Sequence, residues 1–86
     1  MGKDMLPTDT YRTSDLYYAA YLKVAGVPFK DTARDGNRVY FLFEGTEDSL
    51  AMRDLKSQFF NGKAKVSALE YKQAIQTMKS LTHMGN

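Results

Sequence analysis

The apolar residues between Leu16 and Val27 predict a helix that makes contacts on two opposite sides. Lys23 is the only charged residue of this segment. A helix on the surface of a small domain normally has one apolar stripe and an opposite polar face. Helical spacing instead gives two apolar sets, Leu16, Ala20 and Val24 on one side and Tyr18, Leu22 and Ala25 on the other. We therefore expect this helix to face either a partner or a second layer of its own domain.

Local signals bound this helix at about Ser14 to Ala25. Thr13-Ser14-Asp15 supplies an N-cap and an aspartate in the first turn. Gly26 suits the left-handed residue after the last turn, and Pro28 prevents the helix from continuing. Residues 1–10 show little periodicity, so we expect them to form a flexible leader.

A β-hairpin is predicted next. Its clearest strand is Val39-Tyr-Phe-Leu-Phe-Glu, which is β-branched and aromatic and puts Val39, Phe41 and Phe43 on one face. The turn is Asp35-Gly36-Asn37. A three-residue loop would place Phe29, Asp31 and Ala33 opposite Phe43, Phe41 and Val39. A two-residue Asp-Gly loop would instead place Thr32 opposite Val39 and Lys30 opposite Phe41. We favour the first register because it gathers the apolar side chains on one face, with Asp31 as the misfit.

Two further helices complete the chain. Gly45-Thr46-Glu47-Asp48 forms a turn and N-cap for a helix over about Glu47 to Phe60, which Asn61-Gly62 ends. Its inner stripe is Ala51, Leu55 and Phe59, with Met52 adjacent. Ser67-x-x-Glu70 is a capping box that opens a last helix to about Thr82. That helix has an inner face of Tyr71, Ala74, Ile75, Met78 and Leu81 and an outer face of Lys72, Gln76, Lys79 and His83.

The predicted order is therefore helix, hairpin, helix, helix (α-β-β-α-α). A hairpin is not stable alone in water, so its aromatic face must pack on the helices. We expect a small α+β domain over residues 11–82, with residues 83–86 as a frayed C-terminus.

Several short segments together resemble a known family. They are Tyr11-x-Thr13-Ser14-Asp15-Leu16, then Arg34-Asp35-Gly36 before Val39-x-Phe41-x-Phe43-Glu44, then Phe60-Asn61-Gly62-x-Ala64-x-Val66 before a helix with Tyr71 and Ala74. In this order and spacing they resemble an uncharacterised family of short bacterial and phage-encoded domains, described as a domain of unknown function. The resemblance covers about Tyr11 to Leu81. It implies one compact domain in a bacterium, phage or other mobile element, and it supplies no activity or catalytic residue.

Composition argues against an enzyme. The chain has no cysteine, which excludes disulfides and thiolate chemistry. Its one histidine, His83, lies near the end, and its glycines occur singly rather than in a phosphate-binding loop. The acidic residues lack the spacing of a calcium-binding loop. No apolar run is long enough for a signal peptide or a membrane span. We therefore expect a cytoplasmic, non-catalytic protein with no metal, cofactor or small-molecule substrate.

Protein–protein association is the leading functional hypothesis. Tyrosine is favoured at interfaces because it combines a large apolar area with a polar end. A symmetric dimer would bury the non-core side of the first helix, formed by Tyr18, Tyr21, Leu22 and Ala25. The alternative is that the same side packs against the hairpin and belongs to the core.

Nucleic-acid binding is the second hypothesis. Residues 49–86 carry six basic and two acidic side chains, whereas residues 1–48 carry six basic and eight acidic ones. A basic hairpin tip can enter a groove, and an exposed tyrosine can stack on a base. The candidate contacts are Lys30, Arg34, Arg38 and Tyr40 on the hairpin, Lys63 and Lys65 before the last helix, and Lys72 and Lys79 on it. The alternative is that Lys72 and Lys79, seven residues apart on one helix, simply form its solvent-exposed face.

Overall fold

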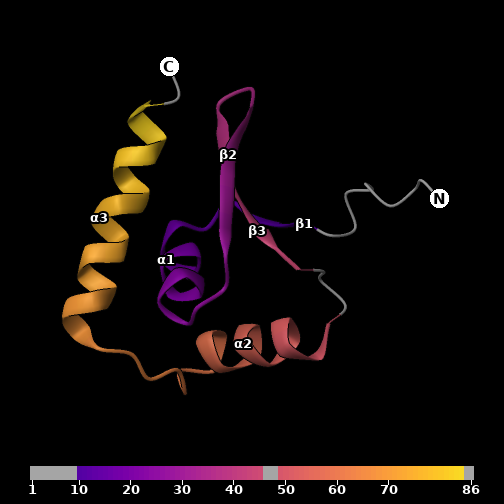
Figure 1. Cartoon of the computed structure of the whole chain (residues 1–86), viewed down its shortest axis with the longest axis vertical. Helices are drawn as coiled ribbons and strands as arrows, with labels where there is room; N and C mark the ends of the chain where they lie inside the picture. Colours follow the sequence, from indigo (N-terminus) through magenta and orange to yellow (C-terminus); the bar gives the residue numbers. More distant parts are fainter. Residues whose placement is uncertain (1–9, 46–48, 85–86) are drawn as a thin grey trace.

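In the computed structural model, which describes residues 10–45 and 49–84, the domain consists of three helices and a three-stranded antiparallel sheet (Figure 1). This confirms the α+β class. The elements are β1 (Thr10–Thr13), α1 (Leu16–Val24), β2 (Phe29–Asp35), β3 (Arg38–Glu44), α2 (Leu50–Phe60) and α3 (Ala68–Met84).

Strand β1 is an element that the hydrophobic pattern did not predict. It pairs antiparallel with β3, with Tyr11 opposite Phe43 and Arg12 opposite Leu42, so the strand order is β1-β3-β2. Thr10, which we assigned to the leader, belongs to it. Four residues with one bulky apolar side chain are too few to show alternation. The open edge of β3, far along the chain, is what makes them a strand.

The hairpin has a two-residue loop, Gly36-Asn37, so both registers considered above are wrong. Thr32 lies opposite Phe41 and Arg34 opposite Val39. Gly36 has a φ of +63°, and glycine at the first central position of a two-residue loop matches the right-handed twist of the strands. A bulge between Phe29 and Asp31 then returns Phe29 to its place opposite Phe43. The bulge moves Asp31 off the core face, which resolves the misfit.

Side-chain caps set the helix starts. Asp15 is the N-cap of α1, and its Oδ1 accepts hydrogen bonds from the backbone N–H groups of Tyr17 and Tyr18 at 3.0 and 3.1 Å. Ser67 Oγ accepts from the Glu70 N–H at 3.3 Å, as the capping box predicted. Helix α3 ends at Met84, so His83 is helical rather than part of a frayed end.

Helix α2 begins later than predicted, with Ser49 as its N-cap. The turn expected at Thr46, Glu47 and Asp48 lies outside the described residues. Met52 is the buried residue of α2, whereas Ala51, which we expected inside, is exposed. The predicted inner and outer faces of α3 are confirmed, with Ala74 and Met78 buried.

Helix α1 is the middle layer of the domain (Figure 1). It lies between the sheet and α3 and packs against α3. Ala19, Ala20 and Ala74 are buried, and such small side chains allow two helix backbones to approach closely. On the other side, the core contains Tyr18, Leu22, Phe41 and Phe43, and Phe59 of α2 stacks at 5.3 Å from the rings of both Tyr18 and Tyr21.

Candidate binding surfaces

The sides of α1 that suggested an interface are mostly enclosed by the domain itself. Tyr18, Tyr21 and Leu22 are 2%, 4% and 0% exposed, and only Ala25 of the four proposed residues is exposed. The Tyr11 hydroxyl donates to that of Tyr18 at 3.3 Å, and burial raises the pKa of Tyr18 well above its ordinary range. Three of the four predicted interface residues are therefore core residues, because sheet and α2 cover the side of α1 that α3 leaves open.

The sheet presents an open surface on the side away from α1. Figure 1 shows α1 and α3 together on one side of the sheet. Residues directly opposite on paired strands point the same way, so the register defines this outer face: Thr10 and Arg12 of β1, Asp31, Ala33 and Asp35 of β2, and Arg38, Tyr40, Leu42 and Glu44 of β3. Tyr40 and Leu42 are half-buried at its centre, and the charged residues around them are exposed.

One row of the outer face has opposite charges at its two ends. Leu42 on the central strand has Arg12 directly opposite on β1 and Asp31 directly opposite on β2. The Arg12 guanidinium lies 4.6 Å from the centroid of the Tyr40 ring, a cation–π contact. Asp31 Oδ1 accepts from the Thr32 N–H at 2.7 Å, and the Asp31 side chain is exposed. Along this row the outer face is thus apolar at Leu42, basic at the β1 edge and acidic at the β2 edge. Arg38 and Glu44 lie at the two ends of β3, and Lys30 Nζ of β2 reaches Thr10 of β1 across it.

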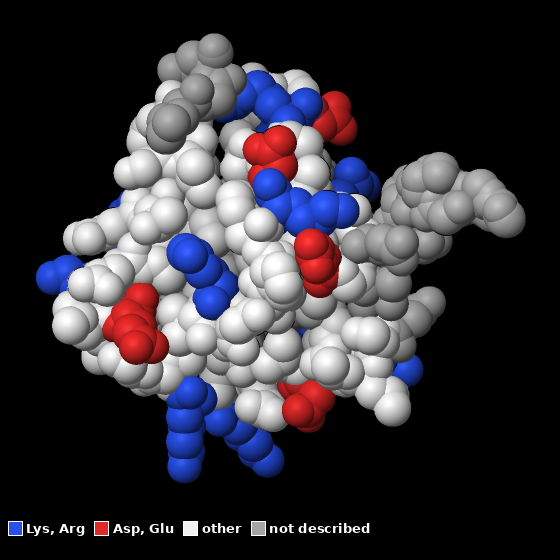
Figure 2. Space-filling view, viewed as in Figure 1, with Lys and Arg blue, Asp and Glu red and all other residues white. Residues whose placement is uncertain are grey.

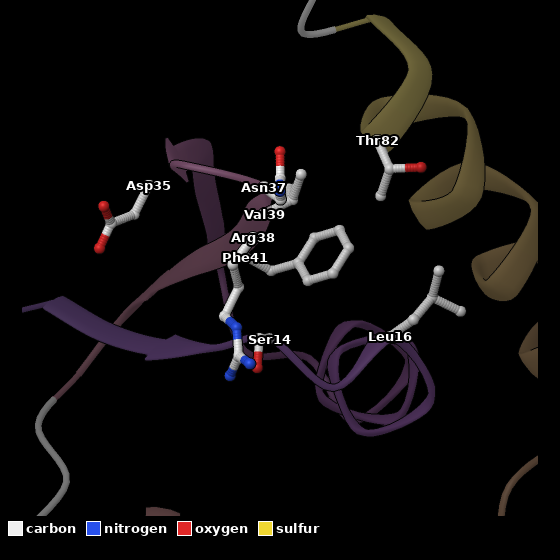
Figure 3. Close-up of a pocket in the computed structure, with 8 residues that line it drawn as sticks. All are labelled: Ser14, Leu16, Asp35, Asn37, Arg38, Val39, Phe41 and Thr82. Carbon is white, nitrogen blue, oxygen red and sulfur yellow. The ribbon is translucent and has the colours of Figure 1, made fainter.

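A cleft of about 700 Å³ lies between the hairpin tip, the start of α1 and the last turn of α3 (Figure 3). Phe41 and Leu16 point into it towards Thr82, while Asp35 points away. Arg34 Nη2 donates to the Thr82 carbonyl at 3.2 Å and ties the hairpin to α3. The cleft thus has an apolar floor and an open rim.

Comparison with known proteins identifies one family. A family model for a domain of unknown function, DUF5659, matches residues 8–84. The chain belongs to the DUF5659 family. No curated protein and no solved structure matches it. The match extends through β1, so the strand that we missed lies inside the DUF5659 domain.

The basic residues of this DUF5659 domain lie on several elements. Figure 2 shows basic and acidic side chains interspersed over the face in view. On the hairpin, Lys30 Nζ donates to Thr10 Oγ1 at 2.9 Å, and Arg34 is bound to Thr82. Arg38 lies next to Asp35, and Tyr40 lies under Arg12. The remaining candidates, on the α2–α3 connection and on α3, are exposed: Lys63, Lys65, Lys72 and Lys79.

Two negative findings concern the described part of the DUF5659 domain. Within residues 10–45 and 49–84, no three His, Cys, Asp or Glu side chains gather where they could hold a metal ion. No helix within those ranges combines the length and apolarity needed to cross a bilayer.

The two ends of the charged row were not predicted from the sequence. Arg12 had no predicted element or role, and the favoured register put Asp31 on the core face. The alternation of Tyr11 and Thr13 with Arg12 was the available signal, but it becomes readable only once β1 is known to pair with β3.

Proposed function

We propose that this protein is a non-catalytic interaction module that pairs with a second copy of itself through the outer face of its sheet. The observation that carries the proposal is the row Arg12, Leu42, Asp31. An apolar centre with opposite charges at its two edges is complementary to its own image. The absence of cysteine supports placing this module in a reducing compartment such as the cytoplasm. The family resemblance implies a bacterial, phage or mobile-element origin.

The pairing follows from simple geometry. A two-fold axis parallel to β3 exchanges the two edges of the sheet, so Arg12 of each copy faces Asp31 of the other while the two Leu42 side chains meet. The same axis brings Arg38 and Glu44, at the two ends of β3, each close to its own copy, and these like charges lower the affinity. Such an interface is isologous, with each contact made twice. Sheets stack about 10 Å apart, a distance that a long arginine and a carboxylate span together.

The area available makes this a weak dimer. Three short strands offer less surface than the roughly 800 Å² per partner of a stable interface. We therefore expect a dissociation constant on the order of 100 μM. Salt will weaken the dimer, because the two charge pairs lie at the rim.

Charge reversal tests this arrangement. Arg12→Asp and Asp31→Arg each place like charges at both contacts, so each variant alone should remain monomeric in sedimentation equilibrium at concentrations where the wild type dimerises. Mixed together, the two variants restore an opposite-charge pair at both contacts and should form a heterodimer. Lys79→Glu, on the exposed face of α3, is the matched control and should dimerise like the wild type.

Two outcomes would contradict the proposal. One is a wild type that stays monomeric at millimolar concentration. The other is a mixture of the two variants that stays monomeric, since this would show that any wild-type dimer uses another surface. Circular dichroism of each variant confirms that its fold is intact.

Nucleic-acid binding is the second candidate function. The Arg12–Tyr40 stack on an open sheet favours it, because aromatic residues on such a face can stack bases. The three acidic residues of the outer face oppose it. Reversing Arg34 and Arg38 should weaken binding of a labelled oligonucleotide and flatten its salt dependence if the hairpin is the contact. Unchanged binding would exclude the hairpin.

A further inference from the structure

A small apolar pocket lies where α2 joins α3, away from the outer face of the sheet. Its volume is about 190 Å³. None of the side chains that line it is charged: Tyr21, Phe59, Gly62, Ala64, Val66 and Tyr71. The Tyr71 hydroxyl donates to the Tyr17 carbonyl at 3.0 Å, which fixes one aromatic wall. The pocket therefore offers a preformed apolar site between three helices.

Large apolar side chains remain exposed around this pocket. Phe60 is 56% exposed, and its ring lies 5.0 Å from that of Phe59 in the pocket wall. Val66, which lines the pocket, is 36% exposed. Single exposed apolar residues are ordinary, but exposed apolar side chains at the wall of an apolar pocket indicate an interaction site.

The same part of the chain is basic. Between Leu55 and Leu69 there is no acidic residue, and the three lysines of that stretch, Lys56, Lys63 and Lys65, are exposed. Lys63 and Lys65 alternate with Ala64 and Val66 along the α2–α3 connection. These two lysines therefore bring positive charge to positions next to the lining residues, although neither lysine lines the pocket itself.

The backbone of this connection is also open to a partner. The Lys63 N–H donates to the Gln58 carbonyl at 2.8 Å. Within the described residues, Ala64, Lys65 and Val66 make no backbone hydrogen bond and belong to no helix or strand. Their N–H and C=O groups can bond to the main chain of a bound segment.

We propose that this pocket binds a short segment of a partner protein in which one large apolar side chain is flanked by acidic residues. The apolar side chain fills the space between Phe59, Val66 and Tyr71. The flanking carboxylates meet Lys63 and Lys65 at the rim. A buried anchor supplies most of the affinity in such interfaces, and complementary rim charges select the partner.

A capped peptide, Asp-Glu-Asp-Phe-Asp-Glu-Asp, titrated into the ¹⁵N-labelled full chain tests this proposal. Backbone amide shifts should move and saturate at Gly62, Ala64 and Val66, with those of the outer face unmoved. A peptide with alanine in place of phenylalanine should bind at least about tenfold more weakly, because it lacks the anchor. A peptide with lysines in place of the acidic residues should not bind.

Two variants separate the anchor from the charges. Ala64→Leu places a larger side chain in the pocket, and the pair Lys63→Glu and Lys65→Glu reverses the rim; each should weaken binding about tenfold or more. Lys79→Glu makes the same kind of charge change away from the pocket and should bind like the wild type. The charge variants change only exposed side chains, so they test the proposal even if Ala64→Leu disturbs the fold.

Three results would overturn the proposal. The first is equal binding of the phenylalanine and alanine peptides, which would reduce the effect to charge. The second is a set of shifts spread over all lysine-bearing segments. The third is a response at the pocket to oligothymidine but not to the peptide, which would make the ligand a nucleic acid.

Discussion

At the scale of single residues, Tyr18 is a candidate interface residue of the sequence that the fold buries in the core. Its ring packs 5.3 Å from both Phe59 and Phe60, and its hydroxyl pairs with that of Tyr11. A tyrosine in the core needs such a partner, because an unpaired buried hydroxyl costs about 1–3 kcal/mol. Tyr11 comes from β1, so this pair also holds the edge strand against α1.

The first prediction concerns alkaline pH. Burial raises the pKa of Tyr18, so the folded protein keeps this proton while an unfolded tyrosine loses it above about pH 10. The unfolded state then binds fewer protons, and the free energy of unfolding should fall by up to about 1.4 kcal/mol per pH unit for this group. Tyr18→Phe should make the fall shallower. Part of the fall should remain in this variant, because burial also raises the pKa of Tyr71.

Urea unfolding between pH 7 and pH 11.5 measures this effect. At pH 7 the variant should be less stable by about 1 kcal/mol, because the Tyr11 hydroxyl loses its partner. Parallel curves for wild type and variant would show that Tyr18 does not control the alkaline loss.

At the scale of elements, α1 is the helix on which the other layers pack. One side of α1 packs on α3 and the other on the sheet. Little of the helix is therefore left for solvent, and Lys23 is its one charged residue. Close packing against α3 depends on Ala20 and Ala74, which are 0% and 4% exposed. Small side chains on the α3 side let the two helix backbones approach closely, so α1 can be covered on both sides within a small domain.

The second prediction tests that packing. Ala20→Leu forces extra atoms between α1 and α3 and should lower the free energy of unfolding by about 1–3 kcal/mol. Ala25→Leu, at the exposed end of the same helix, should change it by less than about 0.5 kcal/mol. Denaturant unfolding of both variants decides the matter, and equal effects would argue against a tightly packed α1–α3 contact.

At the scale of the whole molecule, the layers leave one broad surface without a cover. Helices α1 and α3 lie on the same side of the sheet, so the outer face is left to solvent in the described chain (Figure 1). A domain of 86 residues buries a modest fraction of its surface and has a small stability margin. Pairing through the outer face would add to that margin.

The third prediction follows by mass action. If the dimer forms, the melting temperature should rise with protein concentration, because only the folded chain pairs. The rise should disappear in Arg12→Asp and in high salt, while Lys79→Glu keeps it. Scanning calorimetry over a hundredfold range of concentration measures it. A melting temperature independent of concentration in the wild type would contradict pairing of the folded chains.

The sequence by itself determined the features that depend on neighbouring residues. Ser67 caps α3, Asn61-Gly62 ends α2, and the inner face of α3 follows from helical spacing. Strand β3 is evident from its own composition. These features were predictable because caps, turns and periodicity act within a few residues.

Tertiary structure decided everything that depends on distant parts of the chain meeting. It made Thr10–Thr13 a strand by supplying the edge of β3, and it set the register with a bulge that moved Asp31 to the outer face. It also enclosed Tyr18, Tyr21 and Leu22, which the sequence left open as either core or interface. The row of Arg12, Leu42 and Asp31 exists only after three strands align. Residues this far apart in the chain share no local signal, so only the packed sheet brings their charges into one pattern.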